Sequence, residues 1–216
     1  DKDNHKIALG NVKFDLFSKE LNKVIGTYVT DVNGEIYIEN LRTGDYSLIE
    51  KNTGKWYDLS ENTEIKIEWN KTTETTIENE LKKGRIKVIK VDSENNKVRL
   101  ENVEFEVIDK NGNVLETIKT DSNGEAYTKK YAIRDYQNLF IHETKTNEYY
   151  KVNDTPIEVE LKENQITTIT FKNEKKKGKV EIIKVDKDNK EVKIPNVTFE
   201  IYDEQNNKVD TIVTNE

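Results

Sequence analysis

Three polar residues interrupt the apolar faces of predicted β-strands in the middle of the chain. Ile86 and Val88 share a strand face with Lys90, and the same two-residue period places Glu143 and Asn173 after apolar residues. Alternation therefore predicts that an amine, a carboxyl and a carboxamide enter one interior. For each residue alone, a position at the rim of a strand is the alternative, because polar residues resume where strands end. The recurrence of these residues elsewhere in the chain favours the interior.

A lysine, a glutamate and an asparagine in one apolar interior can react with each other. A buried Lys and Glu must neutralise, pair or react, because an isolated buried charge is strongly unfavourable. Apolar burial lowers the pKa of a lysine and raises the pKa of a glutamate, which favours a neutral amine beside a protonated acid. The amine can then attack the amide carbonyl carbon while the acid polarises the amide and shuttles protons to the leaving ammonia. The expected product is a Lys-Asn isopeptide bond.

The chain repeats itself at a spacing of about 90 residues. Residues 11–17 recur at 102–108 and 196–202, and residues 30–35 recur at 120–125. Several matches in the same order are not expected by chance. They predict that the chain is a tandem array of one kind of domain.

We expect three domains in this array. Residues 1–84 (repeat 1) form a repeat that lacks its first strand, residues 85–177 (repeat 2) a complete repeat, and residues 178–216 (repeat 3) the N-terminal half of a third repeat. Both ends of the chain therefore look cut within domains. The Lys-Lys-Gly junctions between repeats are only a few residues long, too short for neighbouring domains to tumble independently.

The reactive residues recur in the incomplete repeats. Repeat 1 has Glu50 and Asn79 at the positions of the acid and the amide, and repeat 3 has Lys184 at the position of the amine. Only repeat 2 holds all three residue types, so the sequence predicts one intramolecular cross-link, in repeat 2.

Composition excludes several classes of protein. The 216 residues include 35 Lys+Arg and 42 Asp+Glu, which gives a net charge of −7. An acidic chain disfavours nucleic-acid binding, which needs clustered Lys and Arg. No apolar run approaches the roughly 18 residues of a membrane span. The absence of cysteine excludes disulfides, thiolate metal sites and cysteine nucleophiles.

Alternating apolar and polar residues predict β-strands within each repeat. In repeat 2 they occupy residues 85–90, 103–107 and 157–161. Residues 139–141 are interpreted as a central strand, and the Asn-Gly pairs in 109–113 and 122–124 as tight hairpin turns. Without a convincing helix, the expected fold class is all-β, with tandem small antiparallel β-sandwiches, one complete and two truncated.

Several of these segments resemble a Cna B-type (prealbumin-like) repeat. The resemblance is carried by residues 90–92, 102–105, 120–124, 143–150 and 171–173, and it extends over essentially the whole chain. It implies a prealbumin-like or Ig-like sandwich. Such repeats form stalks and pilin-like modules of Gram-positive surface proteins, and many carry a Lys-Asn isopeptide bond promoted by Glu or Asp.

The resemblance also implies a role for each reactive residue. Lys90 and Asn173 correspond to the bonded pair and Glu143 to the promoting acid. Glu50 and Asn79 are then the surviving acid and amide of repeat 1, and Lys184 is the surviving amine of repeat 3. The sequence departs from the family at the usual Pro-Gly after the acid, which is replaced by Asn-Glu at 147–148 and Gly-Lys at 54–55. The loop after the acid can therefore differ from that of the family.

The function implied by the resemblance is a structural stalk module of an extracellular, cell-wall-anchored protein, with its anchor and signal outside this fragment. The alternative is an adhesin module that contacts a host matrix protein or glycan. Apart from a single-turnover self-cross-link, we expect no enzyme activity, no cofactor and no metal. The expected partners are neighbouring repeats of the same chain, and host extracellular matrix through regions outside the fragment, with no nucleic acid and no membrane contact.

Other candidate residues favour structural interpretations. His142 alternates outward, and neither His142 nor His5 has the spacing of a nucleophilic triad. The Asp-Lys-Asp-Asn segments at 1–4 and 186–189 resemble the start of a calcium loop but lack its glycine and distal glutamate, so a turn is the better interpretation. The aromatic pairs at 56–57 and 149–150 are interpreted as core or lid packing over the reactive site, with a sugar-binding platform as the alternative.

Overall fold

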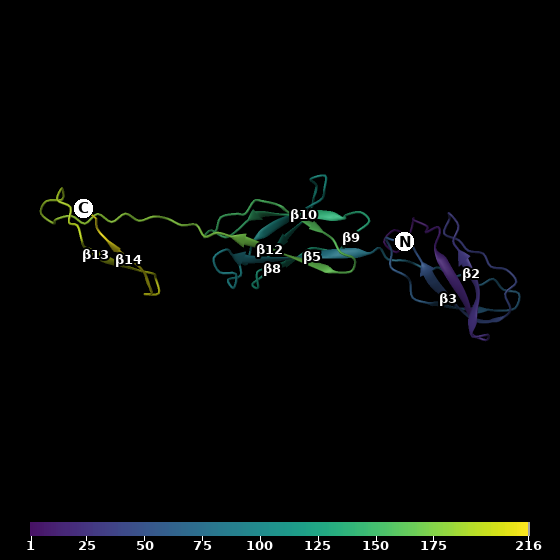
Figure 1. Cartoon of the computed structure of the whole chain (residues 1–216). Coiled ribbons are helices and arrows are strands. Elements are labelled where there is room, and N and C mark those ends of the chain that lie inside the picture. Colours follow the sequence, from purple (N-terminus) through teal and green to yellow (C-terminus); the bar gives the residue numbers. More distant parts are fainter. Residues whose placement is uncertain (216) are drawn as a thin grey trace. The chain divides into compact units, whose positions relative to one another are not determined.

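The computed structural model describes residues 1–215, which belong to two compact units, Asp1–Lys175 and a second that starts at Lys176 (Figure 1). Every regular element in this part of the chain is a β-strand, which confirms the predicted all-β class. Residues 1–215 contain no helix long and apolar enough to cross a membrane. The boundaries between the three expected repeats stay a prediction.

Repeat 2 consists of two sheets. The first has the strand order β11 (Ile157–Glu160), β10 (Asn138–Lys145), β6 (Glu104–Ile108) and β7 (Val114–Lys119). The second has the order β12 (Ile166–Asn173), β5 (Lys83–Asp92) and β8 (Glu125–Tyr127), and β9 (Tyr131–Ala132) also pairs with β5. The central position predicted for residues 139–141 is confirmed, since β10 has a neighbour on each side.

The first and last strands of repeat 2 are neighbours and run in parallel. In the β5–β12 pair, Lys90 lies opposite Phe171 and Asp92 lies opposite Asn173. Among the strand pairs described in repeat 2 this one is parallel, and the others are antiparallel as expected. Because the two strands run in the same direction, the chain enters and leaves this pair at opposite ends.

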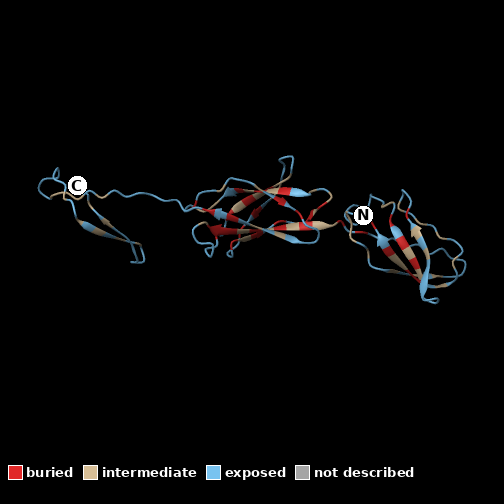
Figure 2. Cartoon of the chain, in the orientation of Figure 1, coloured by how far each residue is buried: buried red, intermediate tan, exposed pale blue. Residues whose placement is uncertain are grey.

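The two sheets of repeat 2 pack their apolar faces together. The core residues come from both sheets and include Ile86, Val88, Phe105, Val107, Leu139, Ile141 and Phe171. Figure 2 shows buried residues alternating with partly buried ones along β5 and the middle of β10. Each such side chain contributes roughly 1.5 to 3 kcal/mol when it leaves water, so the predicted alternation has a direct energetic cause.

Two glycines form the turns at the predicted Asn-Gly pairs. Gly112, with φ of 85°, lies in the hairpin between β6 and β7. Gly124, with φ of 67°, precedes β8, but β7 and β8 belong to different sheets, so the prediction of a second hairpin is wrong. A Cβ at Gly124 would lie 2.7 Å from the Lys90 carbonyl oxygen. Gly124 is therefore required both for its backbone conformation and for its close approach to β5.

Repeat 1 forms one sheet, in the order β2 (Lys23–Val29), β1 (Lys13–Ser18), β3 (Gly44–Asn52) and β4 (Thr63–Ile67). Residues 35–37 and 72–79, which match β8 and β12, lie outside any strand. In repeat 2 both of those strands pair with β5. The described part of repeat 1 has no strand at the position of β5, so these two segments have no shared partner and a second sheet is not formed.

The unit that starts at Lys176 contains one hairpin, β13 (Thr198–Tyr202) with β14 (Lys208–Val213). Residues 180–184, which match residues 86–90 of β5 in the repeat alignment, lie outside any strand. Val180 is 68% exposed and Ile183 58% exposed. An alternating pattern becomes a strand only when a neighbour supplies hydrogen bonds and apolar cover. Within the described residues, segment 180–184 has little of either, although the Ile194 N–H donates to the Lys184 carbonyl at its end, at 2.8 Å.

Candidate functional site

The three residues singled out in repeat 2 come together in its core. Lys90 is on β5, Asn173 is on the neighbouring β12, and Glu143 is on β10 of the opposite sheet. Lys90 and Glu143 are 0% exposed and Asn173 is 1% exposed. The rim positions considered from sequence are therefore wrong for all three. Each residue continues the inward face of its strand, which explains why the sandwich brings them to one place.

Their polar atoms form a closed triangle. The Lys90 ammonium nitrogen Nζ donates a hydrogen bond to Asn173 Oδ1 and lies 2.9 Å from Glu143 Oε2. Asn173 Nδ2 donates to Glu143 Oε1 at 2.5 Å and to Thr146 Oγ1 at 3.0 Å. The lysine is at ion-pair distance from Oε2 without hydrogen-bond alignment. The amide thus directs its oxygen to the amine and its nitrogen to the acid.

Aromatic rings cover the triangle. Lys90 Nζ is 5.8 Å from the centre of the Phe171 ring, which packs 4.9 Å from the ring of Phe105. Burial lowers the pKa of Lys90, and the nearby Glu143 opposes this effect only in part. Because burial removes water from Lys90, its ammonium group loses a proton more easily than that of an exposed lysine.

This arrangement is chemically suited to acyl transfer between side chains. A neutral Lys90 amine is a nucleophile, and it lies beside the carbonyl end of the Asn173 amide. The Glu143 carboxyl lies next to the amide nitrogen, which would leave as ammonia. Nucleophile, electrophile and proton-transfer group are thus within one hydrogen-bonded cluster, as general acid–base catalysis requires.

Repeat 1 contains the acid and the amide of the same arrangement. Glu50 is 5% exposed and Asn79 is 3% exposed. Asn79 Nδ2 donates to Glu50 Oε2 at 2.7 Å and to the Asp58 carbonyl at 2.9 Å, and the Ser60 N–H donates to Glu50 Oε2 at 2.5 Å. We name this Glu50–Asn79 pair the half-site. Its amide nitrogen faces the acid, as in repeat 2.

The structure does not bring Lys184 into either cluster. Lys184 lies in the unit that starts at Lys176, and its Nζ donates to the Val185 carbonyl at 3.2 Å. Its assignment to a cross-link stays a prediction from the repeat alignment.

Sequence reasoning did not identify Thr146 as part of the site. Its hydroxyl accepts the second hydrogen of the Asn173 amide. A signal was present, because each acid is followed by a threonine three residues later: Thr146 follows Glu143, and Thr53 follows Glu50. The comparison of the two repeats at this spacing would have found it.

A second buried group, also missed, lies at the C-terminal end of β5. The Tyr150 hydroxyl donates to Asp92 Oδ2 at 2.8 Å, and Lys175 Nζ lies 3.1 Å from the same oxygen. Hydrogen bonds, foremost that of Tyr150, hold the pKa of Asp92 well below its usual range. Burial, followed by the bond to Asp92, raises the pKa of Tyr150 to about 12. Tyr150 therefore ties the loop after the acid to the end of β5.

The remaining candidates have simpler surroundings. Tyr150 is buried as the lid interpretation predicts, but that interpretation is wrong for the exposed Tyr149. His142 is partly exposed, with Nδ1 3.9 Å from Glu106 Oε2. Within residues 1–215, no group of three or more His, Cys, Asp or Glu side chains is arranged to hold a metal ion.

Comparison with known protein families decides the classification. The model of the SpaA prealbumin-like fold domain matches residues 1–81 and 84–175. The chain belongs to this family. The resemblance to prealbumin-like repeats noted in the sequence is thereby confirmed, together with the all-β sandwich class.

Solved structures similar to this SpaA-family chain include the TIE protein of Bacillus anthracis, with 30% identity and a TM-score of 0.72. That match covers 98% of this chain and 40% of the TIE protein, so the chain spans well under half of that relative. The minor pilin GBS52 of Streptococcus agalactiae matches with 15% identity and a TM-score of 0.40, covering 81% of this chain and 87% of the pilin. No curated protein matches the chain.

Proposed function

We propose that this chain is a structural stalk module of a bacterial surface protein, and that repeat 2 carries an isopeptide bond between Lys90 and Asn173. Glu143 is the proton-transfer group for its formation, which needs no enzyme. The observation that carries the proposal is the closed, fully buried triangle of amine, acid and amide. Membership of the SpaA prealbumin-like fold family supports the structural role.

The proposed reaction exchanges one amide for another. A proton passes from Lys90 to Glu143, and the neutral amine attacks Cγ of Asn173. The new Nζ–Cγ bond forms, the Cγ–Nδ2 bond breaks, and Glu143 returns a proton to the departing nitrogen, which leaves as ammonia. The second proton of Nζ passes to Glu143, so that a neutral secondary amide remains. Apart from ammonia no atom is lost, and no oxidant or cofactor is required.

The position of the bond suits a load-bearing role. Force applied along the chain enters repeat 2 at the start of β5 and leaves it after β12, and these strands run side by side in parallel. A covalent link from Lys90 to Asn173 joins the two strands near their C-terminal ends, so tension passes through the link. The intervening part of the sandwich is then not loaded.

The proposed cross-link also compensates for the absence of disulfides. It would close a loop with a sequence separation of 83 positions. If the entropy model for disulfides applies, this closure stabilises the domain by roughly 4 to 5 kcal/mol. A thin sandwich with a small core gains most from such a link.

Intact mass is the direct test. We expect the chain to be lighter than its sequence mass by one ammonia, and proteolysis to yield a branched peptide joining Lys90 to Asn173. Glu143→Ala should restore the full mass, whereas the matched variant Glu50→Ala in repeat 1 should leave the loss unchanged. An unmodified mass for the wild-type chain would overturn the proposal.

The proposed stalk function also gives a role to the three expected repeats. We propose that residues 1–84, 85–177 and 178–216 are successive repeats of one stalk, displayed outside the cell and attached to the wall through regions beyond this sequence. The partners of this fragment are then its neighbouring repeats. The chain acts as a spacer and not as an enzyme, apart from its single self-cross-linking turnover.

A further inference from the structure

The Trp56 side chain of repeat 1 packs against the core of repeat 2. Both repeats belong to the compact unit Asp1–Lys175, and Trp56 is one of the partly buried apolar side chains that lie against the core cluster of repeat 2. It is carried by residues 56–58, which lie between β3 and β4 and which we name the docking loop. Core packing was one interpretation of this residue from sequence, and the core that it contacts belongs to the next repeat.

The Tyr57 hydroxyl of the docking loop joins a carboxylate of repeat 1 to a guanidinium of repeat 2. It donates to Asp1 Oδ2 at 2.8 Å and accepts from Arg134 Nη1 at 2.9 Å. Arg134 Nη1 also lies 3.3 Å from Asp1 Oδ2, and the Asp1 side chain is fully buried. The other Arg134 nitrogens donate to the neighbouring Asp135 carboxylate, which holds the guanidinium in place. A buried carboxylate needs an opposite charge, and Arg134 provides it from the other repeat.

Repeat 2 contains the same carboxylate–tyrosine pair with a cation of its own. Tyr150 donates to Asp92 Oδ2, and Lys175 Nζ lies 3.1 Å from that oxygen. Asp1 and Asp92 match in detail, since Oδ1 of each accepts the backbone N–H groups two and three residues later. The residue of repeat 1 that matches Lys175 is Leu81, because each forms a β-bridge with the tyrosine of its repeat. Repeat 1 has no cation at this position, and the next repeat supplies one.

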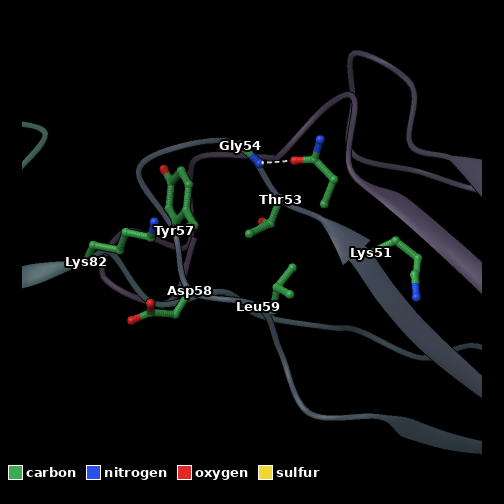
Figure 3. Close-up of a pocket in the computed structure, with 8 residues that line it drawn as sticks. Lys51, Thr53, Gly54, Tyr57, Asp58, Leu59 and Lys82 are labelled. Carbon is green, nitrogen blue, oxygen red and sulfur yellow. Dashed lines mark hydrogen bonds between the residues drawn. The ribbon is translucent and has the colours of Figure 1, made fainter. Parts of the chain in front are cut away.

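Polar side chains surround the docking loop at the junction. Asn164 Nδ2 of repeat 2 donates to both carboxylate oxygens of Asp58, at 3.1 Å each. Lys82 Nζ lies 2.9 Å from Glu163 Oε2 of repeat 2. Figure 3 shows Tyr57, Asp58 and Lys82 near one another on one side of the hollow that all three line. An apolar anchor with polar contacts around it is the usual composition of a specific interface.

The segment that links the two repeats is fixed on repeat 2 as well. The Lys82 carbonyl accepts from the Ile133 N–H at 3.0 Å, and the Lys83 carbonyl accepts from the Asn164 N–H at 2.8 Å. Gly84 is buried, and a Cβ there would lie 3.0 Å from a backbone oxygen of the loop before β12. The linker is therefore held by repeat 2 and does not act as a free hinge while these contacts persist.

We propose that the N-terminal end of repeat 2 is a docking surface for the preceding repeat, and that it binds a docking loop whose carboxylate–tyrosine pair lacks a cation of its own. Trp56 is the apolar anchor, and Arg134 is the contact that selects the partner. A preceding repeat with a lysine at the position of Leu81 is disfavoured, because that ammonium would repel Arg134 and already neutralise the carboxylate. Docking couples the stabilities of the two repeats. The inference goes beyond the cross-link proposed for repeat 2 and does not require it.

The two tryptophans allow the junction to be observed in the full chain. Trp69 is 86% exposed, so Trp69→Phe leaves Trp56 as the reporter, and Trp56→Phe leaves Trp69 as the exposed reference. We expect the fluorescence emission of Trp56 to lie at shorter wavelength than that of Trp69, and to move towards it in Arg134→Gln. The matched variant Arg99→Gln, at an exposed arginine of repeat 2, should leave it unchanged. Equal emission of the two tryptophans, or no response to Arg134→Gln, would overturn the proposal.

Hydrogen exchange measures whether repeat 1 stabilises repeat 2. The Ile133 and Asn164 amides of repeat 2 donate to carbonyls of the linker. Trp56→Ala should speed their exchange by about tenfold or more, which corresponds to about 1.4 kcal/mol, because an interface tryptophan is commonly a hot spot. Tyr149→Ala, at the matching position of repeat 2, is the control, since Tyr149 is 69% exposed.

Protection of the β1 and β3 amides shows whether repeat 1 stays folded in Trp56→Ala. If it does, unchanged exchange at Ile133 and Asn164 refutes the coupling. If it does not, Arg134→Gln decides, because this substitution lies outside repeat 1 and should speed exchange at the same two amides.

Leu81→Lys tests the selection of the partner. In this variant repeat 1 supplies its own cation, as repeat 2 does with Lys175. We expect the emission of Trp56 to move towards that of Trp69. Leu59→Lys adds the same charge to repeat 1 at a residue that is 57% exposed, and should have no effect. Equal effects of the two lysines would show that the missing cation does not select the partner.

Intact mass separates this inference from the proposed function. A chain that has lost one ammonia but has an exposed Trp56 overturns the docking and leaves the cross-link intact. A chain of unmodified mass with a docked Trp56 does the reverse.

Discussion

Removal of Glu143 provides a mechanical test of the proposed cross-link. In Glu143→Ala the amine and amide stay in place, but the group that moves protons between them is lost. We expect repeat 2 to fold without the bond. Tension on the chain would then shear β5 past β12, because the two strands are parallel and are pulled at opposite ends.

The size of the effect follows from the position of the two residues. Lys90 and Asn173 are 83 positions apart in sequence, and an extended chain spans about 3.4 Å per residue. Rupture of an uncross-linked repeat 2 therefore releases about 28 nm of chain between these residues. With the bond intact that length is not released, because the covalent link holds the two residues together and the chain between them is not stretched.

Single-molecule stretching of the full chain between handles can measure this length. The wild type should show no extension step of about 28 nm or more from repeat 2, and Glu143→Ala should show one. Glu50→Ala, which alters the matching acid of repeat 1, should behave as the wild type in this respect. A step of that length in wild-type protein whose mass shows the loss of ammonia would refute the assignment of the bond to Lys90 and Asn173.

Three further predictions concern stability. Glu143→Ala should lower the melting temperature of repeat 2 by roughly 20 to 35 °C in calorimetry, because a loop constraint of several kcal/mol is lost. Gly124→Ala should destabilise repeat 2 and slow the loss of ammonia more than Gly112→Ala, because both have positive φ but only the Cβ at 124 meets the Lys90 carbonyl; equal effects would contradict this reasoning. The lowered pKa of Asp92 means that its stabilisation is complete above about pH 4 and is lost as the pH falls through the folded-state pKa, so Asp92→Asn should reduce the difference between urea midpoints at pH 7 and pH 3.

The candidate site of repeat 2 could be predicted from the sequence because its three polar residues occupy strand positions where the alternation predicts apolar residues. Lys90 follows Ile86 and Val88 on one face of a strand, and the two-residue period leaves little freedom in where its side chain points. The same holds for Glu143 and Asn173. Periodicity thus places each residue in the interior, and the sandwich needs only two sheets to bring them together.

Features that depend on which strands are neighbours could not be predicted from the sequence pattern. The parallel pairing of β5 with β12 joins segments far apart in sequence, and no local pattern distinguishes it from an antiparallel pair. Residues 180–184 have the alternation of the matching β5 residues but form no strand, because alternation needs a partner strand to become one. Thr146 was missed because a hydroxyl near a strand end is common, and its contact with Asn173 appears only in three dimensions.

The order of folding and chemistry follows from burial. Before reaction, enclosing Lys90 and Glu143 in the core opposes folding, since both groups lose water and the lysine pKa falls. Reaction would replace the amine and the primary amide with one neutral secondary amide, which no longer carries a charge, and the departure of ammonia would make the step irreversible in practice. The cluster assembles only when β5, β10 and β12 are packed, so the bond can form only in a folded domain.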